Sequence, residues 1–166
     1  MLQPVVRRTW APRGQTPIHR SWDRHDRLSI ISALTISPRR RRLGLRFRIH
    51  DHNICHGDVM KFLSQVRREV GGDVTVVLDR LNAHRTAVRK MRERNPSGYH
   101  FEWLPPYAPD LNPVEQIWGH TKYADLANFI PDDLRHLGKE ARRSLTSTGS
   151  DQSLLRAFIR HAKLSL

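Results

Sequence analysis

The first half of the chain carries two apolar runs joined by a basic turn. Residues 28–36 are apolar or small almost throughout, which predicts a buried strand. Residues 43–49 alternate, with Leu45, Phe47 and Ile49 against polar or small neighbours, and this is the period of a half-buried return strand. Pro38 and a run of arginines between the two strands predict an exposed hairpin tip.

Helical spacing follows in residues 56–70, where apolar side chains recur every three or four positions until Gly71 ends the run. Residues 74–78 are short, apolar and β-branched, which predicts a central strand covered on both faces. The remaining pattern predicts a helix over 84–94, a strand over 99–104, helices over 112–126, 131–145 and 153–164, and a polar turn over 146–151. This order of elements predicts an α/β sandwich around a mixed sheet.

The charge of the chain favours a polyanionic partner. Its 29 lysines and arginines exceed its 16 acidic residues, so the net charge is +13. Residues 1–50 account for +10 of this, with twelve arginines and only Asp23 and Asp26 as acids. Nucleic acid is the first partner that such a balance suggests, and an anionic membrane surface is the second.

Cysteine content and hydropathy indicate the compartment. Cys55 is the only cysteine of the 166 residues, so no intramolecular disulfide can form and a reducing environment is expected. Membrane-spanning helices need roughly twenty apolar residues, and no stretch of the chain approaches this. The first residues lack the order of a signal peptide. We therefore expect a cytoplasmic protein.

Two carboxylates stand out by position. Asp79 directly follows the predicted strand 74–78, where α/β sheets place ligand-binding groups, and Glu115 opens the predicted helix 112–126, with thirty-five residues between the two. A plainer interpretation exists for each. Asp79 could form a turn and cap the next helix, and Glu115 could complete a capping box with Asn112 as the N-cap. Spacing alone leaves both alternatives open.

The flanking residues resemble a known family. Leu-Pro-Pro-Tyr-Ala-Pro-Asp-Leu-Asn-Pro-Val-Glu-Gln-Ile-Trp-Gly, residues 104–119, resembles the third-carboxylate motif of mariner-type bacterial insertion-sequence transposases, which belong to the Asp-Asp-Glu superfamily and have a ribonuclease-H-like fold. Residues 76–85 resemble the second-carboxylate motif, including its following histidine. Residues 7–17 are similar to the hairpin after the first strand of the family, and residues 27–34 to its third strand.

The resemblance implies metal-dependent DNA cleavage and strand transfer. In this chemistry carboxylates hold two Mg²⁺ or Mn²⁺ ions about 3.5–4 Å apart. Here Asp79 and Glu115 would be the ligands, Lys122 could meet a DNA phosphate, and Asn82 and His84 could orient Asp79 or the DNA backbone or simply start a helix. The implied partners are double-stranded DNA, as transposon ends and target, and a second copy of the chain or a full-length transposase.

The departures from the family pattern matter as much. The family carries its first catalytic aspartate on a strand before the Trp-x-Pro-x-Gly hairpin, yet only nine residues precede Trp10 and none is acidic. We therefore expect an N-terminally truncated catalytic core over 1–126, without its first strand, followed by helices over 127–166 that pack on it. The helix-turn-helix region is also expected to be absent, and Arg80 stands where many relatives have asparagine.

Such a chain is expected to be inactive by itself. Asp51 or Asp110 could replace the missing carboxylate, although neither lies where the family places its first strand. Two rival functions remain open: a non-catalytic basic DNA-binding protein derived from a transposase, and another metal-dependent nuclease that uses Asp51.

Two further segments have a plain and a functional interpretation. Residues 50–58 gather His, Asp and Cys, but their spacing matches no familiar structural zinc pattern, so a polar loop is the preferred interpretation. The run Arg39-Arg40-Arg41-Arg42 is either a solvated hairpin tip or a clamp for DNA phosphates.

Overall fold

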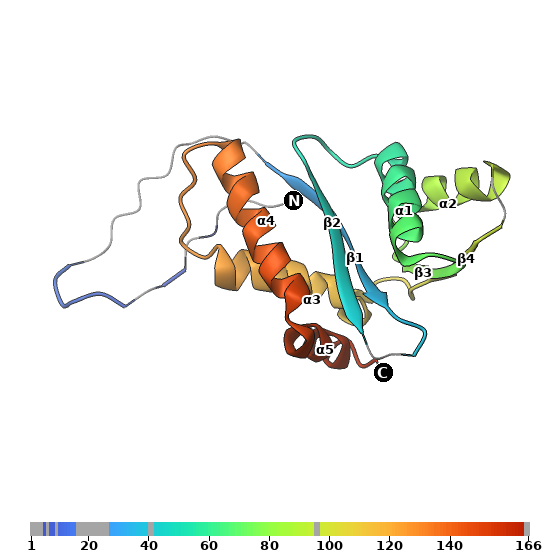
Figure 1. The fold of residues 1–166 in the computed structure, drawn as a ribbon. Coiled ribbons are helices and arrows are strands. Elements are labelled where there is room, and N and C mark those ends of the chain that lie inside the picture. The colour runs from blue at the N-terminus through green and yellow to red at the C-terminus, as the bar shows by residue number, and fades with distance from the viewer. Residues whose placement is uncertain are drawn as a thin grey trace.

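The computed structural model of the protein contains five α-helices and four strands among the residues that it describes, which are 5, 7–8, 10–15, 27–39, 42–94 and 97–164 (Figure 1). Strands β1 (Ser29–Ile36) and β2 (Leu43–His50) form the predicted hairpin. They pair antiparallel along their whole length, from Ser29 opposite His50 to Ile36 opposite Leu43. The alternating residues of β2 therefore face opposite sides of this hairpin, as their period predicts.

The next four elements form a parallel strand pair with helices on one face. Helix α1 (His56–Val70) and strand β3 (Val74–Leu78) have the predicted bounds, and helix α2 (Asn82–Arg94) leads to strand β4 (Tyr99–Trp103), which pairs parallel with β3. A shared core holds the unit together, with α1 supplying Val59, Phe62, Leu63 and Val66, α2 supplying Ala87, Val88 and Met91, and the strands supplying Leu78 and Phe101.

The prediction that residues 74–78 are covered on both faces is wrong. Helices α1 and α2 pack against each other on the face of Leu78, and the side chains of the opposite face are open to solvent. Val77 is 58% exposed. The run resembled a doubly covered strand because its outward residues, Thr75 and Val77, are also β-branched, and their exposure depends on how the helices dock.

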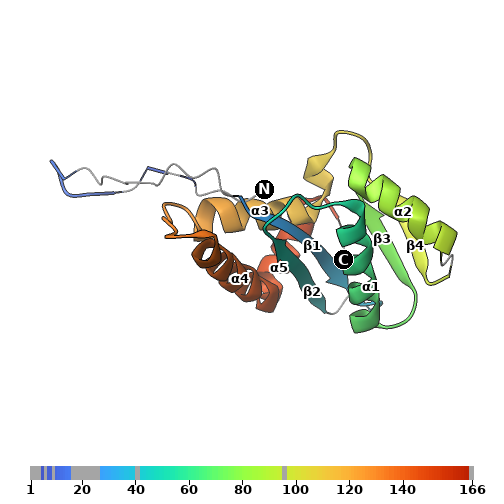
Figure 2. The same cartoon turned by 90° about the horizontal axis from the view of Figure 1, so that it is seen from above.

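The four strands make two small sheets instead of the single mixed sheet that the element order predicted. Within the described residues, β1 pairs only with β2, and β3 pairs only with β4. Ile31 of β1 nevertheless belongs to the same core as α1 and β3, so α1 covers parts of both sheets. Figure 2 shows the two sheets lying on either side of α1 in this view.

The C-terminal half is helical. A short turn, η1 (Pro109–Leu111), precedes α3 (Pro113–His120), which continues as one π-helical turn, η2 (Thr121–Asp125), and is followed by α4 (Leu134–Ser150) and α5 (Gln152–His161). The helix predicted over 112–126 is thus confirmed to within one residue at each end, with its last turn π-helical. The π-helical turn is tied to α4, because the Ser144 hydroxyl donates to Asp125 Oδ2 at 2.6 Å.

The polar turn predicted over 146–151 is also wrong. Helix α4 runs to Ser150 because Leu145 and Thr148 are buried, and the chain reverses within a single residue, Asp151. The Asp151 carboxylate caps α5 by accepting from the Leu154 N–H at 2.9 Å. Polar residues over 146–151 suggested a loop, but they form the last, partly exposed turn of the helix.

Two further clusters attach these helices to the β1–β2 hairpin. Ile117 of α3, Leu145 of α4, and Leu155 and Ile159 of α5 pack with Leu43 and Leu45 of β2. Leu137 and Ala141 of α4 pack with Leu28 and Leu126. Among the described residues, no helix is long and apolar enough to cross a membrane.

Candidate active site

Asp79 lies immediately after β3, and its carboxylate is held from two sides. Asp79 Oδ1 lies 2.5 Å from Nδ1 of His84, which is in the first turn of α2, and accepts from the Leu81 N–H at 3.1 Å. Burial opposes ionisation of this carboxyl, but the hydrogen bonds from His84 and Leu81 outweigh it, so the pKa of Asp79 lies below its ordinary value. The side chain is therefore a carboxylate with a fixed direction.

The chain that leaves β4 passes beside Asp79. The Leu104 N–H donates to the Leu78 carbonyl at 2.8 Å, which extends the parallel pairing by one residue. The Arg80 guanidinium donates to the Leu104 carbonyl at 3.3 Å. These two bonds fix the start of the proline-rich segment that leads to Glu115.

Glu115 lies in the first turn of α3, whose start is set by local signals. Pro113 occupies the first helical position, and the Asn112 side chain accepts from the Val114 N–H at 3.1 Å. The capping-box alternative for Glu115 is not realised, because the Asn112 N–H donates to the Pro109 carbonyl at 2.9 Å instead. Among the described residues, no hydrogen bond to a protein group engages the Glu115 carboxylate.

Helix α3 is anchored on β1, which fixes where Glu115 points. Ile117 is completely buried, and the Trp118 indole N–H donates to the Ser32 hydroxyl at 2.8 Å. Ser32 lies in the middle of β1, so α3 crosses this strand. The two carboxylates are thus carried by separate units, Asp79 by the β3–β4 unit and Glu115 by the helix on the β1–β2 hairpin.

The fold brings these two carboxylates close enough to interact. Burial raises the pKa of Glu115, and the negative charge of Asp79 raises it further. In the described part of the chain, neither carboxylate forms an ion pair with a lysine or an arginine. Two oxygen donors of like charge without a lysine or arginine partner are a suitable arrangement for a hard divalent cation.

A third ligand does not join them within the described residues. The one group of three His, Cys, Asp or Glu side chains found there consists of His50, His52 and Asp58, which lie elsewhere. Asp51 pairs with His52 in the loop after β2, and Asp110 is an exposed residue of η1. The structure therefore gives no support to either aspartate as the replacement for a missing carboxylate.

The other residues expected at the site are more dispersed. Asn82 is the exposed first residue of α2, and Lys122 lies in the π-helical turn with its Nζ 5.1 Å from the centre of the Tyr123 ring. Arg39 and Arg42 are exposed at the hairpin tip. Arg40 and Arg41 lie outside the described residues.

A basic groove between α2 and β4 is the feature that was not predicted from the sequence. It has a volume of about 580 Å³ and is lined mainly by Trp103 and by Arg80, Arg85, Arg89 and Arg92. The last three arginines follow the i, i+4, i+7 spacing of one helix face, so the signal was present in the sequence. That β4 places an indole beside this face could be seen only in the structure.

We expect Glu115→Gln to change the pH dependence of stability. A raised pKa means that the folded state holds its proton more tightly than the unfolded chain does, so wild-type stability falls as pH rises through 4.5 and the higher folded value. Glutamine cannot ionise, so it removes this loss of stability. From pH 4 to pH 7 the free energy of unfolding of the variant should therefore rise relative to that of the wild type, by less than about 1 kcal/mol since the site is partly solvated.

Urea denaturation of the metal-free proteins at several pH values measures this difference. Glu102→Gln, at an exposed position of β4, is the matched control and should leave the pH curve of the wild type unchanged. Parallel curves for Glu115→Gln and wild type would contradict the raised pKa of Glu115.

Comparison with known proteins identifies the family. Residues 1–137 match the model of the DDE superfamily endonuclease family, and this range includes both carboxylates and all four strands. No curated protein matches the chain.

One solved structure, the crystal structure of the Mos1 strand transfer complex, has a similar fold, with a TM-score of 0.58 and 15% sequence identity. The match covers 98% of this chain and 47% of the other, so this chain spans about half the length of that relative. The similarity supports the ribonuclease-H-like α/β class expected from the sequence. Because the family match covers more than half of the residues, the chain belongs to the DDE superfamily endonucleases.

Proposed function

We propose that this protein is part of a mariner-type bacterial insertion-sequence transposase, and that its site serves DNA cleavage and strand transfer in the cytoplasm. The observation that carries the proposal is the meeting of Asp79 and Glu115, which come from different units of the fold and interact strongly enough for one charge to raise the pKa of the other. The family membership of residues 1–137 supports the same reaction class.

The donor set fits Mg²⁺ or Mn²⁺. Asp79 and Glu115 offer only carboxylate oxygens, which these hard cations prefer, and a bound cation would remove the repulsion between the two charges. When bound, such a metal supplies activation of a water or a 3′-hydroxyl and stabilisation of the leaving oxygen. His84 orients the Asp79 carboxylate, and the capped first turn of α3 fixes Glu115.

We also propose that the chain by itself is inactive, because no third carboxylate joins Asp79 and Glu115 among the described residues. Within the described part, β1 and β3 each lack a strand partner on one side, although Ile31 and Leu78 share one core under α1. A strand inserted between them would join the two sheets and would end near Asp79. An aspartate on that strand would supply the third carboxylate.

Double-stranded DNA is the proposed partner, as transposon end and as target. The groove lined by Arg85, Arg89 and Arg92 also contains Arg80, the residue that follows Asp79 in the chain, and its positive charge suits a DNA backbone. The exposed Arg39 and Arg42 add positive charge at the hairpin tip. A second copy of the chain or a full-length transposase is the proposed protein partner, in line with the strand transfer complex that has a similar fold.

The salt dependence of DNA binding tests the groove. We expect replacement of Arg85, Arg89 and Arg92 by glutamine to reduce the slope of log K against log salt by up to about 2.7, because each phosphate contact contributes about 0.9. Fluorescence anisotropy with a labelled duplex at a series of salt concentrations measures the slope. The matched control, with lysine at all three positions, keeps the charge and should keep most of the slope.

The same assay tests the hairpin tip. Glutamine at Arg39, Arg40, Arg41 and Arg42 should reduce the slope by up to about 3.6 if all four meet phosphates. An unchanged slope in one variant would remove that surface from the proposed DNA path. Unchanged slopes in both would contradict the DNA-binding proposal for these surfaces.

A non-catalytic DNA-binding protein is the second candidate function. It is favoured by one observation, namely that no third carboxylate joins Asp79 and Glu115 among the described residues. Mn²⁺-dependent nicking that requires both Asp79 and Glu115 would support the transposase proposal. DNA binding without nicking in every form of the chain, including one with an added strand, would support the second candidate.

A further inference from the structure

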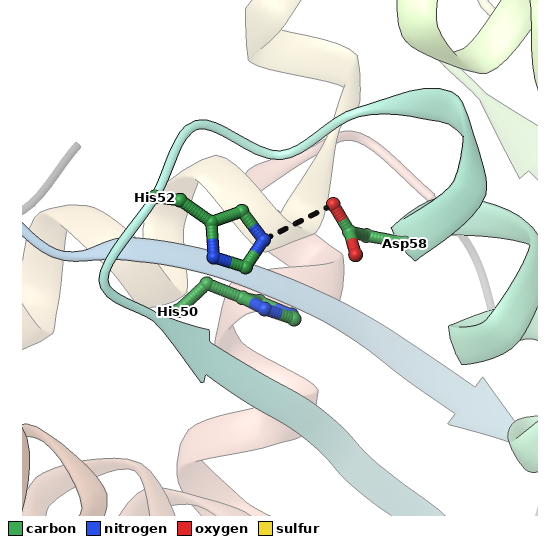
Figure 3. A group of neighbouring side chains, drawn as sticks. All are labelled: His50, His52 and Asp58. Carbon is green, nitrogen blue, oxygen red and sulfur yellow. Dashed lines mark ion pairs between the residues drawn. The ribbon is translucent and has the colours of Figure 1, made fainter.

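A second group of potential metal ligands lies where the β1–β2 hairpin joins α1. His50 is the last residue of β2, His52 lies in the following bend, and Asp58 is in the first turn of α1. The potential ligand atoms of these three side chains all lie within 4.8 Å of one another. Figure 3 shows the two imidazole rings and the carboxylate converging, and His52 Nε2 lies 3.4 Å from Asp58 Oδ2.

One of these atoms has an unmet bonding requirement. His50 Nε2 is inaccessible to solvent and has no hydrogen-bond partner among the described residues. A buried polar atom without a partner is destabilising, so such an atom in a folded protein calls for an explanation. Coordination of a cation by this nitrogen would satisfy it.

The other two ligands are already oriented. Asp51 Oδ1 lies 3.1 Å from Nδ1 of His52, which leaves Nε2 of that ring directed at Asp58. A carboxylate on the far nitrogen of a ligating histidine is the usual outer support of a metal site. The Cys55 N–H donates to Asp58 Oδ2 at 2.9 Å and so fixes the second ligand.

From this geometry we propose that His50, His52 and Asp58 bind one divalent transition-metal ion, with zinc as the first choice. Two imidazoles and one carboxylate suit zinc better than Mg²⁺, which prefers oxygen ligands. Ligand atoms around tetrahedral zinc are about 3.3 Å apart, so the three side chains must move closer together to bind the ion. His52 can move, because it is on an exposed bend.

The proposed zinc site is separate from the carboxylates of the active site and has a different role. It links the end of β2 to the start of α1, the helix that covers parts of both sheets. A bound ion would therefore stabilise the junction between the hairpin and the β3–β4 unit. The spacing of residues 50–58 matched no structural zinc pattern because the three residues lie on three elements: His50 at the end of β2, His52 in the bend and Asp58 on α1.

Zinc titration of the untagged, chelator-treated protein tests this site. We expect calorimetry to give one site per chain and thermal unfolding to show a higher Tm with Zn²⁺. His52→Ala, on the exposed bend, and Asp58→Asn should each weaken Zn²⁺ binding more than 100-fold. Asp51→Asn should weaken it 10–100-fold, as expected for an outer support.

Three controls separate this site from other ligands. His136→Ala removes a different histidine that pairs with an aspartate, at the start of α4, and should leave Zn²⁺ affinity unchanged. Cys55→Ser should also leave it unchanged. The double variant Asp79→Asn with Glu115→Gln should still bind one Zn²⁺.

Wild-type affinity in His52→Ala, verified as folded by circular dichroism, would overturn the proposal. Loss of binding in Cys55→Ser or in the Asp79 and Glu115 double variant would also overturn it, because the ion would then use other ligands. Retained binding in that double variant, with loss in His52→Ala, would support the zinc site whether or not the active-site proposal holds.

Discussion

Extension of this chain by a strand that carries an aspartate should raise Mn²⁺-dependent nicking of supercoiled plasmid by at least about 1,000-fold over the 166-residue chain. The reason is that carboxylates around a metal centre act as a unit, so the loss of one removes most of the rate. Asp79 and Glu115 lie near enough for the charge of one to act on the other. In the described part of the chain, the sides of β1 and β3 without a strand partner are where a further strand would pair.

The design needs three proteins. The first is the chain as it stands, the second is extended upstream of Met1 by a strand-forming segment with an aspartate, and the third has asparagine in place of that aspartate. The asparagine form completes the sheet but lacks the added carboxylate. Comparison with the aspartate form therefore separates the effect of the added strand on the fold from the effect of the carboxylate on nicking. DNA binding by each protein serves as the test of folding.

Within the active form, Asp79→Asn and Glu115→Gln should each return nicking to the level of the unextended chain. Nicking by the 166-residue chain alone, lost in both of these variants, would contradict the proposed inactivity of this chain, since the third ligand would then come from this chain. Equal activity of the aspartate and asparagine extensions would contradict the role of the added carboxylate.

The second large effect is expected in the core that carries Glu115. Ile117→Ala should lower the free energy of unfolding by about 2–5 kcal/mol, because it removes a completely buried side chain from the cluster with Leu145, Leu155 and Ile159. Urea denaturation monitored by circular dichroism measures the loss. For a domain of this size such a loss is a large part of the total stability.

Two controls calibrate the Ile117 result. Ile117→Val should cost only about 0.5–1.5 kcal/mol, since a single methyl group is removed. Val77→Ala, at a 58% exposed position, should change stability by less than about 0.5 kcal/mol. A loss below 1 kcal/mol for Ile117→Ala would mean that α3 is not anchored through this side chain.

The Ile117 position also links packing to the site. Ile117 follows Glu115 by two residues on α3, so the same packing that stabilises the helix fixes the direction of the carboxylate. The Trp118 bond to Ser32 adds a second point of attachment. A less firmly seated helix would place Glu115 less well relative to Asp79.

Elements with strong local signals were predictable from the sequence. The bounds of α1 and β3 were predicted correctly, because helical spacing ends at Gly71, which adopts a φ of 75°, and the β-branched run follows at once. The start of α3 was also encoded locally, by Asn112 and Pro113. Candidate carboxylates were found in the same way, because strand ends and helix starts can be recognised in a sequence.

The errors occurred where distant contacts override local pattern. The turn predicted over 146–151 is helical because burial of Leu145 and Thr148 extends α4. Which face of β3 is covered depended on where α1 and α2 dock, and no pattern within residues 74–78 contains that information.

The sequence by itself indicated the two candidate carboxylates and determined the basic character of the chain and the order of its elements, because each depends on residues that are close neighbours along the chain. Only the tertiary structure decided that Asp79 and Glu115 interact, that Arg85, Arg89 and Arg92 share a groove with Trp103, and that two histidines converge on Asp58. Each of these depends on how separate elements pack, and that packing is set by burial of side chains far apart in the sequence.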